Sequence, residues 1–350
     1  MPSTIRSIGK SAFYGHSNLK KVDVADIAAW GKVSFGDAYS NPLYYAHALY
    51  HNGIPVTNLA FSEGTTEIEG TSFANCTNIV SITIPSSVTN IAAGAFSGDS
   101  ALSAVGISDI AAWCQLSFQS ETANPLYYAH MLYLNGTSSS ILAIPDGVKN
   151  IGQYAFAGCT NIIDIAIPNN VTNIGAYAFE GCRNLVSLEL GDGIASIEGG
   201  AFSDCSAIEE VRIPSIETWL NVNFKPTSGR YPDYSSNPLI NAKRLYVDGA
   251  EVSDIDIPAS IKTIPDYSFY NFLGIINLRI PASVRSVGVC AFSNCKRLEA
   301  MTIGENATRG IASINASAFQ YCTNLSVIAI GNSVTNIDRK STRLNSSHAR

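Results

Sequence analysis

The sequence predicts a repeat solenoid, in which short coils of chain stack on one another. Three observations support this: an Ala-Phe or Ser-Phe step recurs along the 350 residues, a short strand pattern recurs with it, and three longer inserts copy one another. Self-similarity at a period of about 20 to 30 residues is typical of repeats that bury apolar side chains only against their neighbours. The phenylalanines of the step are Phe13, Phe73, Phe96, Phe156, Phe179, Phe202, Phe269, Phe292 and Phe319.

The segment from Asn161 to Cys182 shows the pattern of one coil. Ile165 and Ile167 alternate with other residues, and this period of two predicts a very short strand whose isoleucines both point inward. Pro168 ends the strand because proline cannot donate a ladder hydrogen bond. A return arc then leads to Phe179, whose burial contributes about 1.5–3 kcal/mol and makes it the main core anchor of the arc.

The second inward strand position can be followed through the chain, and seven of its intervals are 23 residues long. We therefore expect about twelve short parallel strands. The last interval holds four extra residues, which predict a bulged loop at residues 305–309. The twelve positions are Val24, Phe61, Ile84, Ile107, Ile144, Ile167, Leu190, Ile213, Ile257, Ile280, Ile303 and Ile330.

Three long intervals lack the Ala-Phe step and carry copies of one insert, which begin at Asp26, Asp109 and Ser215. The copies share a Trp, a Phe and the motifs Asn-Pro-Leu, Leu-Tyr and Asn/Asp-Gly. They predict a short helix capped by the first residue and ending at the Trp, followed by a hairpin with a type I′ turn. We expect Trp30, Trp113 and Trp219 to be buried within the inserts rather than exposed to a partner. The expected hairpin tips are Asn52-Gly53, Asn135-Gly136 and Asp248-Gly249.

The composition fits a chain with a large interior. Apolar residues make up 46% and charged residues 14%, and no shift in composition marks a linker. We expect one continuous domain over residues 1–337. No apolar run reaches 18 residues, which argues against a membrane-spanning segment. The net charge of −6, without a basic stripe, argues against a nucleic-acid partner.

Both ends of the sequence are expected to be truncated. Met1-Pro2 aligns with the Ile-Pro that precedes the return arc elsewhere, so the chain is expected to begin inside a repeat. Residues 338–350 break the pattern, and Asp338 to His348 matches the translation of a common sequencing-library adapter, which predicts a non-native tail. Without this tail, 18 basic residues face 27 acidic ones, a net charge of −9. The alternative is a basic tail that binds an acidic partner.

The cysteines form a ladder in phase with the repeat. Six of the eight follow the repeat phenylalanine by three residues, where other coils have His16, Asp99 and Phe272. We expect them to be free thiols that act as small buried apolar groups, because their spacing fits neither disulfides nor zinc ligands. No metal or cofactor site is predicted. The six are Cys76, Cys159, Cys182, Cys205, Cys295 and Cys322.

The sequence predicts a protein without enzymatic activity. It shows no nucleophile, base and orienting group in one place, no glycine-rich phosphate loop and no zinc-protease or hydrolase motif. His47 and His130 occupy equivalent insert positions, and the third copy has Lys243 there. We therefore expect structural roles for both histidines.

The residue between the two inward strand positions points to solvent. Most such residues are small, as stacked strands on a curved face favour. Glu189, Arg212, Asp256 and Arg279 form a charged run of alternating sign, which predicts a ladder of cross-strand pairs and candidate ligand contacts. Tyr44 and Tyr127 in the inserts are further candidates, because aromatic side chains concentrate interface energy. The twelve residues are Asp23, Ala60, Thr83, Gly106, Ala143, Ala166, Glu189, Arg212, Asp256, Arg279, Thr302 and Ala329.

The frame Leu-x-x-Ile-x-Ile-Pro-x-x-Val-x-x-Ile-Gly-x-x-Ala-Phe-x-x-Cys resembles the BspA-type, or Treponema-type, leucine-rich repeat. Residues 162–182 and 278–295 carry it, and the resemblance extends over residues 1–337. It implies a right-handed leucine-rich-repeat horseshoe from a cell-surface or secreted protein of a bacterium or protist. The roles that it implies are adhesion to host matrix proteins, other cells or surfaces. The expected location rests on this resemblance, because the sequence carries no signal peptide or anchor.

Three functions remain open at this stage. The first is a binding or adhesion module whose partner is a protein or glycan on host or neighbouring cells. The second is a structural stalk that presents another domain; exchange of Glu189, Arg212 and Arg279 for other polar residues would then leave adhesion unchanged. The third is an accessory repeat region of a larger secreted enzyme.

Overall fold

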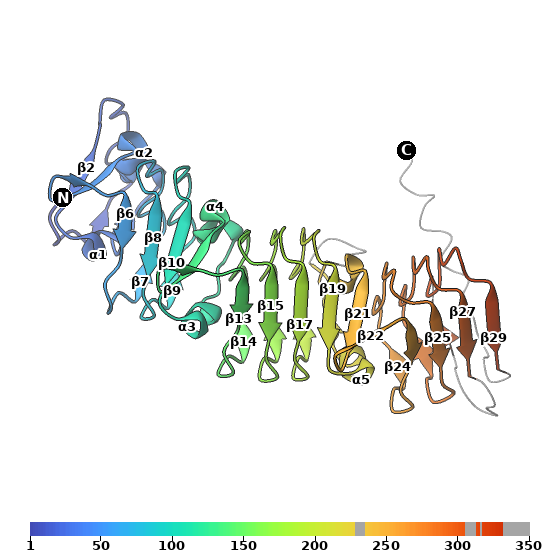
Figure 1. Ribbon diagram of the computed structural model, residues 1–350. Coiled ribbons are helices and arrows are strands. Elements are labelled where there is room, and N and C mark those ends of the chain that lie inside the picture. Colours follow the sequence, from blue (N-terminus) through green and yellow to red (C-terminus); the bar gives the residue numbers. More distant parts are fainter. Residues whose placement is uncertain (228–234, 305–312, 316, 332–350) are drawn as a thin grey trace, which may run out of the picture. The chain divides into compact units, whose positions relative to one another are not determined.

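The computed structural model describes residues 1–227, 235–304, 313–315 and 317–331 (Figure 1). The chain forms two compact units: unit 1 comprises residues 1–163 and 177–183, and unit 2 comprises residues 164–176 and 184 onward. The single domain over residues 1–337 therefore stays a prediction. The bulged loop expected at residues 305–309 and the tail at 338–350 lie outside the described residues.

In unit 1 the longer strands form two sheets with the orders β2-β4-β5 and β6-β8-β10-β11-β12. Neighbouring coils pair in parallel and in register, so that Val105 lies beside Ile82 and Ile107 beside Ile84. These four side chains are at most 3% exposed. The strands are β2 (Val22–Val24), β4 (Leu49–His51), β5 (Ile54–Pro55), β6 (Asn58–Ala60), β8 (Ser81–Ile84), β10 (Ala104–Ile107), β11 (Leu132–Leu134), β12 (Thr137–Ser138) and β13 (Ile141–Ala143).

In unit 2 the longer strands run in the orders β15-β17-β19-β21-β22 and β23-β25-β27-β29. Figure 1 shows β15, β17, β19 and β21 side by side in chain order. The solvent-facing surface of these strands, and of their counterparts in unit 1, is called the sheet face below. The strands are β15 (Asp164–Ile167), β17 (Ser187–Leu190), β19 (Glu210–Ile213), β21 (Arg244–Val247), β22 (Ala250–Val252), β23 (Asp254–Asp256), β25 (Asn277–Ile280), β27 (Ala300–Ile303) and β29 (Val327–Ile330).

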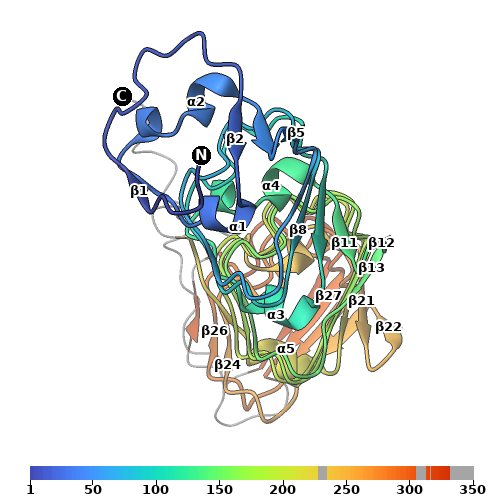
Figure 2. The ribbon, with the colours of Figure 1, turned by 90° about the vertical axis from the view of Figure 1, so that its left-hand side faces the viewer.

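Two-residue strands on the return arcs form small sheets of their own, such as β16-β18-β20 in unit 2. In Figure 2 the strands β24 and β26 of unit 2 lie on the opposite side of the coil from β21 and β27. The short strands are β1 (Ser7–Ile8), β3 (Ser34–Phe35), β7 (Glu67–Ile68), β9 (Asn90–Ile91), β14 (Asn150–Ile151), β16 (Asn173–Ile174), β18 (Ser196–Ile197), β20 (Asn223–Phe224), β24 (Thr263–Ile264), β26 (Ser286–Val287) and β28 (Ser313–Ile314).

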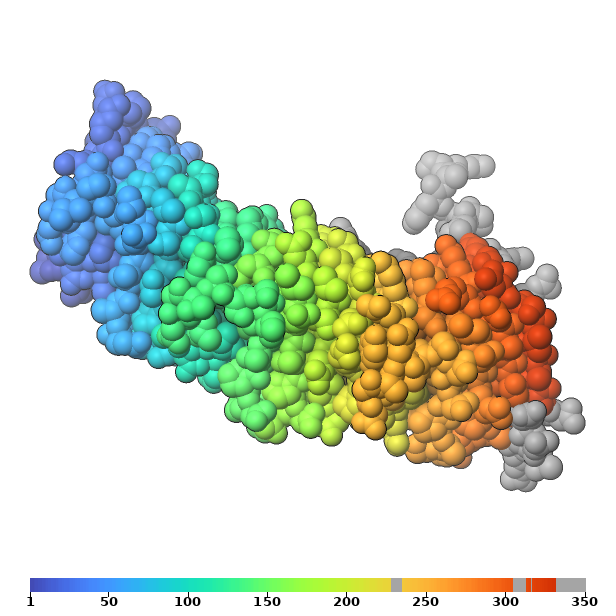
Figure 3. Space-filling model, viewed as in Figure 1, coloured from blue at the N-terminus to red at the C-terminus, as the bar shows by residue number. Residues whose placement is uncertain are grey.

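Seven of the nine repeat phenylalanines are buried in the core, and rings of successive coils stack on one another. In unit 1, Phe156 and Phe179 lie with ring centroids 5.4 Å apart at an interplanar angle of 5°. In unit 2, Phe269 and Phe292 lie 5.2 Å apart at 8°. Within each unit the colours of Figure 3 change in successive bands, as expected when each coil lies on its neighbours. This arrangement confirms the predicted solenoid.

The predicted capped helices and hairpins of the inserts are confirmed, although the helices of the second and third inserts run past the tryptophan to Gln115 and Leu220. Each insert adds two strands to the twelve inferred from the spacing, one parallel and one antiparallel. Its Leu-Tyr motif forms a parallel strand in the sheet, and its tip has positive φ at both turn residues, for example 51° at Asn52 and 81° at Gly53. The helices are α1 (Ile27–Trp30), η1 (Ala38–Ser40), α2 (Leu43–Ala46), α3 (Ile110–Gln115), η2 (Glu121–Ala123), α4 (Leu126–Ala129), α5 (Ile216–Leu220) and η3 (Pro238–Ile240).

The insert tryptophans are buried, as the sequence predicts, and take over the role of the missing phenylalanine step. Trp113 is 1% exposed, packs 5.6 Å from the ring of Phe118, and donates from Nε1 to the carbonyl of Ala155 at 2.8 Å. Trp30 and Trp219 make the same bond to Ser72 and Ser268. Each indole therefore ties the insert to the next coil that carries the step.

The Asn of Asn-Pro-Leu is a second link between coils. Asn124 is fully buried, accepts from the backbone N–H of Leu126 at 2.9 Å, and donates to the carbonyls of Tyr154 and Ala155 at 2.7 and 3.0 Å. Asn237 repeats these contacts with Leu239, Tyr267 and Ser268. The insert signature is thus explained by folding alone.

The ladder cysteines are free thiols, and all six are buried except Cys322, which is half-buried. All eight cysteines are free, and Cys182 and Cys295 each donate a weak hydrogen bond to the phenylalanine carbonyl of the preceding coil. Burial raises the pKa of Cys159 to about 12. Thiols held in the protonated form are poor nucleophiles, so these cysteines serve packing.

We expect Asn124→Ala to destabilise the protein by at least about 2 kcal/mol, because buried backbone groups at three positions lose their partner. Urea unfolding followed by circular dichroism measures this. Asn90→Ala is the control, since the Asn90 side chain is exposed and such substitutions stay within about 0.5 kcal/mol. Equal effects of the two substitutions would contradict the linking role of Asn124.

Candidate functional site

The sheet face presents the side chains that the core does not use. On β10, Val105 and Ile107 are buried whereas Gly106 between them is half-buried. None of the twelve residues predicted to face solvent is buried. The face therefore can vary in sequence without disturbing the packing of the coils.

Each insert places a tyrosine on this face. In the Leu-Tyr motif the leucine points inward, and Leu132 is 4% exposed, so the tyrosine points outward. Tyr133 lies in register with Gly106, and Tyr246 with Arg212. Sequence reasoning missed these tyrosines because it treated the motif only as part of a hairpin. The strand alternation applied to Leu-Tyr would have shown them.

A hollow of about 380 Å³ lies on the sheet face of unit 1 beside Tyr133. Gly106 leaves room there, and a Cβ at this position would meet Thr83 Oγ1 at 3.4 Å. Hydroxyl and amide groups of Ser81, Thr83, Ser108 and Asn135 surround the hollow. An aromatic wall with several neutral hydrogen-bonding groups can hold an uncharged polar ligand.

In unit 2 the charged side chains pair with one another. Arg212 bonds Glu210 of its own strand at 2.7 Å and lies 4.2 Å from the centre of the Tyr246 ring. The bond to Glu210 raises the pKa of Arg212, with a smaller contribution from Glu189, which lies in register with it. Lys243 bonds Glu209 at 2.8 Å and thereby holds the pKa of Glu209 below its usual value.

The prediction of one ladder from Glu189 to Arg279 is wrong at its middle step. Arg212 and Asp256 are not on neighbouring strands, because β21 and β22 of the third insert follow β19 and a separate sheet begins with β23. Asp256 and Arg279 do form a pair, with Oδ1 and Nε 3.3 Å apart. Both are well exposed, so the pair contributes little stability. Their role as ligand contacts stays a prediction.

Tyr44 and Tyr127 lie on the short insert helices rather than on longer strands. Each is 37% exposed. The ring of Tyr44 packs edge-on against Tyr39 and Tyr45, and that of Tyr127 against Tyr128. Neither lines the hollow beside Tyr133, so ligand contact by either remains a prediction.

Comparisons with known proteins follow the repeat pattern. The family model described as BspA type leucine rich repeat region matches in 6 copies over residues 1–40, 45–124, 131–232 and 242–346. The chain belongs to this family. A search of curated proteins gives no match.

Solved structures similar to this BspA-type chain come from several bacteria. A leucine-rich repeat protein of Bacteroides ovatus is 17% identical over 95% of this chain and 78% of its own, with a TM-score of 0.48. A leucine rich cell surface protein of Faecalibacterium prausnitzii is 18% identical over 79% and 88%, with a TM-score of 0.34. The pneumococcal vaccine antigen PcpA is 14% identical over 83% and 74%, also at 0.34. Likeness at this level carries no information about function.

The insert histidines of this BspA-type protein have structural surroundings. His47 and His130 end α2 and α4 with positive φ values of 55° and 60°. Nδ1 of His130 lies 3.0 Å from the carbonyl of Gly158. Over the described ranges, no three or more His, Cys, Asp or Glu side chains are grouped to hold a metal ion. In the same part of the chain, no helix has the length and apolar character needed to cross a membrane.

Asp99 is a buried acid that the repeat pattern does not require. It replaces a ladder cysteine, is 0% exposed, and accepts from the N–H of Cys76 through Oδ1 at 2.8 Å. Its Oδ2 has no hydrogen-bond partner. Burial raises the pKa of Asp99 to about 9, although the bond from Cys76 acts in the opposite direction. The folded protein therefore holds Asp99 protonated at neutral pH.

We expect the protein to lose stability as the pH rises from about 4 to about 9, because the unfolded chain releases the Asp99 proton near its ordinary pKa while the folded chain retains it to about 9. The slope contributed by this group reaches about 1.4 kcal/mol per pH unit. Thermal unfolding at pH 5 and pH 8 measures it. Asp99→Asn, which stays neutral and keeps an acceptor for Cys76, should remove this part of the slope. An unchanged slope in Asp99→Asn would contradict the assignment.

Proposed function

We propose that the chain is a non-enzymatic binding module of a bacterial or protist cell-surface protein, and that its sheet face binds a protein or glycan of a host or neighbouring cell. The observation that carries this proposal is the hollow beside Tyr133. It lies on a surface whose residues the core does not use, and its lining combines an aromatic ring with neutral hydrogen-bonding groups. Tyrosine is enriched among residues that dominate binding energy.

The charged patch on unit 2 supports the stalk function more than ligand binding. Its ions already have partners within the protein, including Glu210 for Arg212 and Glu209 for Lys243. A ligand would have to replace these ion pairs, and its net binding energy would be smaller for that reason. We therefore assign binding to the face of unit 1, because the charged side chains of unit 2 are paired with one another.

We expect Gly106→Arg and Tyr133→Ala each to weaken ligand binding at least about 10-fold, since the first fills the hollow and the second removes its aromatic wall. The purified chain is applied to a glycan array and to immobilised extracellular-matrix proteins, and the variants are tested on whatever binds. Thr302→Arg is the matched control, because it adds the same side chain at an outward position of β27 in unit 2.

Two results would count against this function. Binding that Gly106→Arg and Thr302→Arg reduce equally would show that the hollow is not the site. If the chain binds neither the glycan array nor the matrix proteins, the stalk function is favoured. For a stalk, exchange of Glu189, Arg212 and Arg279 for other polar residues should also leave whole-cell adhesion unchanged.

A further inference from the structure

The longer-strand sheet of unit 1 is interrupted at the first insert. After β4 the chain turns at Asn52-Gly53 and β5 pairs back on β4 in antiparallel fashion. The next strand, β6, starts a different sheet, and among the described residues β8 is its only strand neighbour. The edge of β6 that faces away from β8 therefore has no strand paired to it. In a regular coil both edges are paired, as for β8, which lies between β6 and β10.

The hydrogen bonds of β6 show which backbone groups lie on the open edge. Ser81 donates to the carbonyl of Thr57 at 3.2 Å, and Phe61 donates to the carbonyl of Thr83 at 3.1 Å. In a trans peptide the C=O and N–H point in opposite directions, so the N–H of Asn58 and the C=O of Ala60 point away from β8. The strand alternation places the C=O of Asn58 and the N–H of Ala60 on the same edge.

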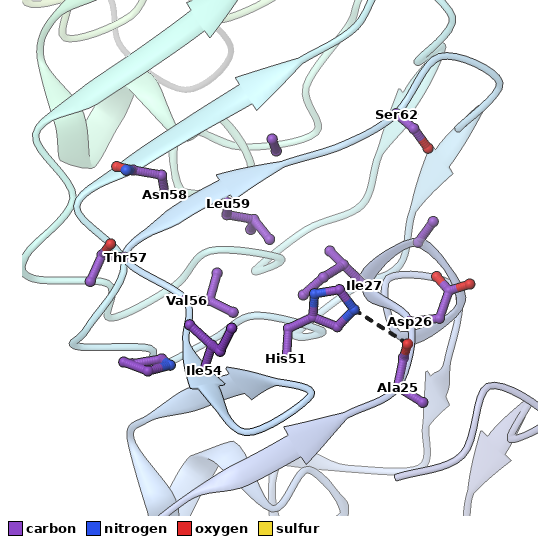
Figure 4. A pocket seen from close by; sticks show the side chains of 13 residues that line it. Ala25, Asp26, Ile27, His51, Ile54, Val56, Thr57, Asn58, Leu59 and Ser62 are labelled. Carbon is purple, nitrogen blue, oxygen red and sulfur yellow. Dashed lines mark hydrogen bonds between the residues drawn. The ribbon is translucent and has the colours of Figure 1, made fainter.

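A pocket of about 610 Å³ lies along this edge. This volume is within the range of about 300–1,000 Å³ that is common for ligand sites. Figure 4 shows β6 on one side of the pocket, with the His51 ring and the start of α1 on the other. Nε2 of His51 lies 3.3 Å from the carbonyl of Ala25. The apolar residues of the lining include Ile54, which is 69% exposed, Pro55, which is exposed, and Ile27, which is half-buried.

The third insert in unit 2 has a corresponding open edge that carries charges. Asn277 of β25 donates to the carbonyl of Ser253, and Ile257 donates to the carbonyl of Arg279 on β25. Asp254 and Asp256 of β23 therefore direct their backbone groups to the other side. Charged side chains on an edge strand discourage the addition of another strand. At the equivalent positions β6 has the neutral residues Asn58 and Ala60. The edge of β6 therefore differs from that of β23 in carrying no charge. After the second insert β13 also begins a sheet and is uncharged, so the choice of β6 rests on the pocket that its edge lines.

We propose that an extended peptide segment of a partner protein binds in this pocket as an added strand along β6. An extended peptide alternates donors and acceptors at the spacing that Asn58 and Ala60 present, which is the basis of strand addition to a sheet edge. The apolar lining takes an apolar side chain of the peptide. The lining has no Lys or Arg but includes Asp26, so acidic peptides are not favoured.

This inference deepens the proposed binding function by naming a class of partner, and it rests on that function only in taking the partner to be a protein. The pocket and the hollow beside Tyr133 share no lining residue. Variants at the two places can therefore be tested separately.

The test uses a phage library of random eight-residue peptides selected on the full chain, followed by affinity measurement with synthetic peptides. We expect binders with apolar residues at alternate positions. Ala60→Pro should weaken them at least about 10-fold, because proline removes the N–H that faces the pocket without removing a ladder bond to β8. Ala60→Ser keeps that N–H and should change affinity less than about 3-fold.

Two further measurements complete the test. Hydrogen exchange with bound peptide should slow at the amides of Asn58 and Ala60, and change little at Leu59, whose amide faces β8. If thermal unfolding shows that Ala60→Pro is not folded, Ala60→Asp, which copies Asp256 of β23, replaces it and should also weaken binding. Asp256→Pro on β23 is the control and should leave peptide affinity unchanged.

The proposal is overturned if the library yields no binder, or if selected peptides bind the wild-type chain and the Ala60→Pro and Ala60→Asp variants equally. It is likewise overturned if glycans but no peptides protect the amides of Asn58 and Ala60. Loss of array binding in Gly106→Arg with no peptide binder would leave the proposed function standing and reject strand addition alone. If peptides bind but Gly106→Arg does not change array binding, strand addition is supported and the hollow beside Tyr133 is rejected as the binding site.

Discussion

Contact between successive coils is the constraint on which the rest of this structure depends. A coil of 23 residues cannot enclose an apolar core by itself, so its inward side chains are buried only because the next coil covers them. The stacked rings of Phe156 and Phe179 and the in-register isoleucines of β8 and β10 express this within unit 1. The same contacts satisfy the backbone, since parallel pairing along the stack supplies hydrogen bonds that no coil makes internally.

The inserts preserve this contact where the regular repeat is broken. They replace the phenylalanine step by an indole and a buried asparagine, as Trp113 and Asn124 show, and both bond the carbonyl of Ala155 in the next coil. They also interrupt the sheet, because the hairpin at each insert turns one edge back on itself. Side chains therefore keep the core packed at each insert, although the sheet is interrupted there. The open edge of β6 results from this interruption, and the tyrosines of the sheet face lie on the strands that the inserts add.

Much of this could be predicted from the sequence, because a repeat reports the same packing many times. The strand positions, helix caps, hairpin tips, buried tryptophans and free cysteines all follow from residues that recur in register. What could not be predicted depends on the order of strands in space. Arg212 was expected to neighbour Asp256, but the insert strand brings Tyr246 beside it instead. The hollow at Gly106 and the pocket at β6 have no sequence signature, since each arises from a missing side chain or a missing neighbour.

Hydrogen exchange of Phe179→Ala tests the central claim most directly, because it reports stability coil by coil. If neighbouring coils alone cover each other's core, removing this ring should lower protection most in the adjoining coil of Phe156, whose ring stacks on it. Protection in the more distant β7–β9 pair of unit 1, at Ile68 and Ile91, should change least. Equal loss of protection at Phe156, Ile68 and Ile91 would contradict the account, because it would show one cooperative core rather than a stack.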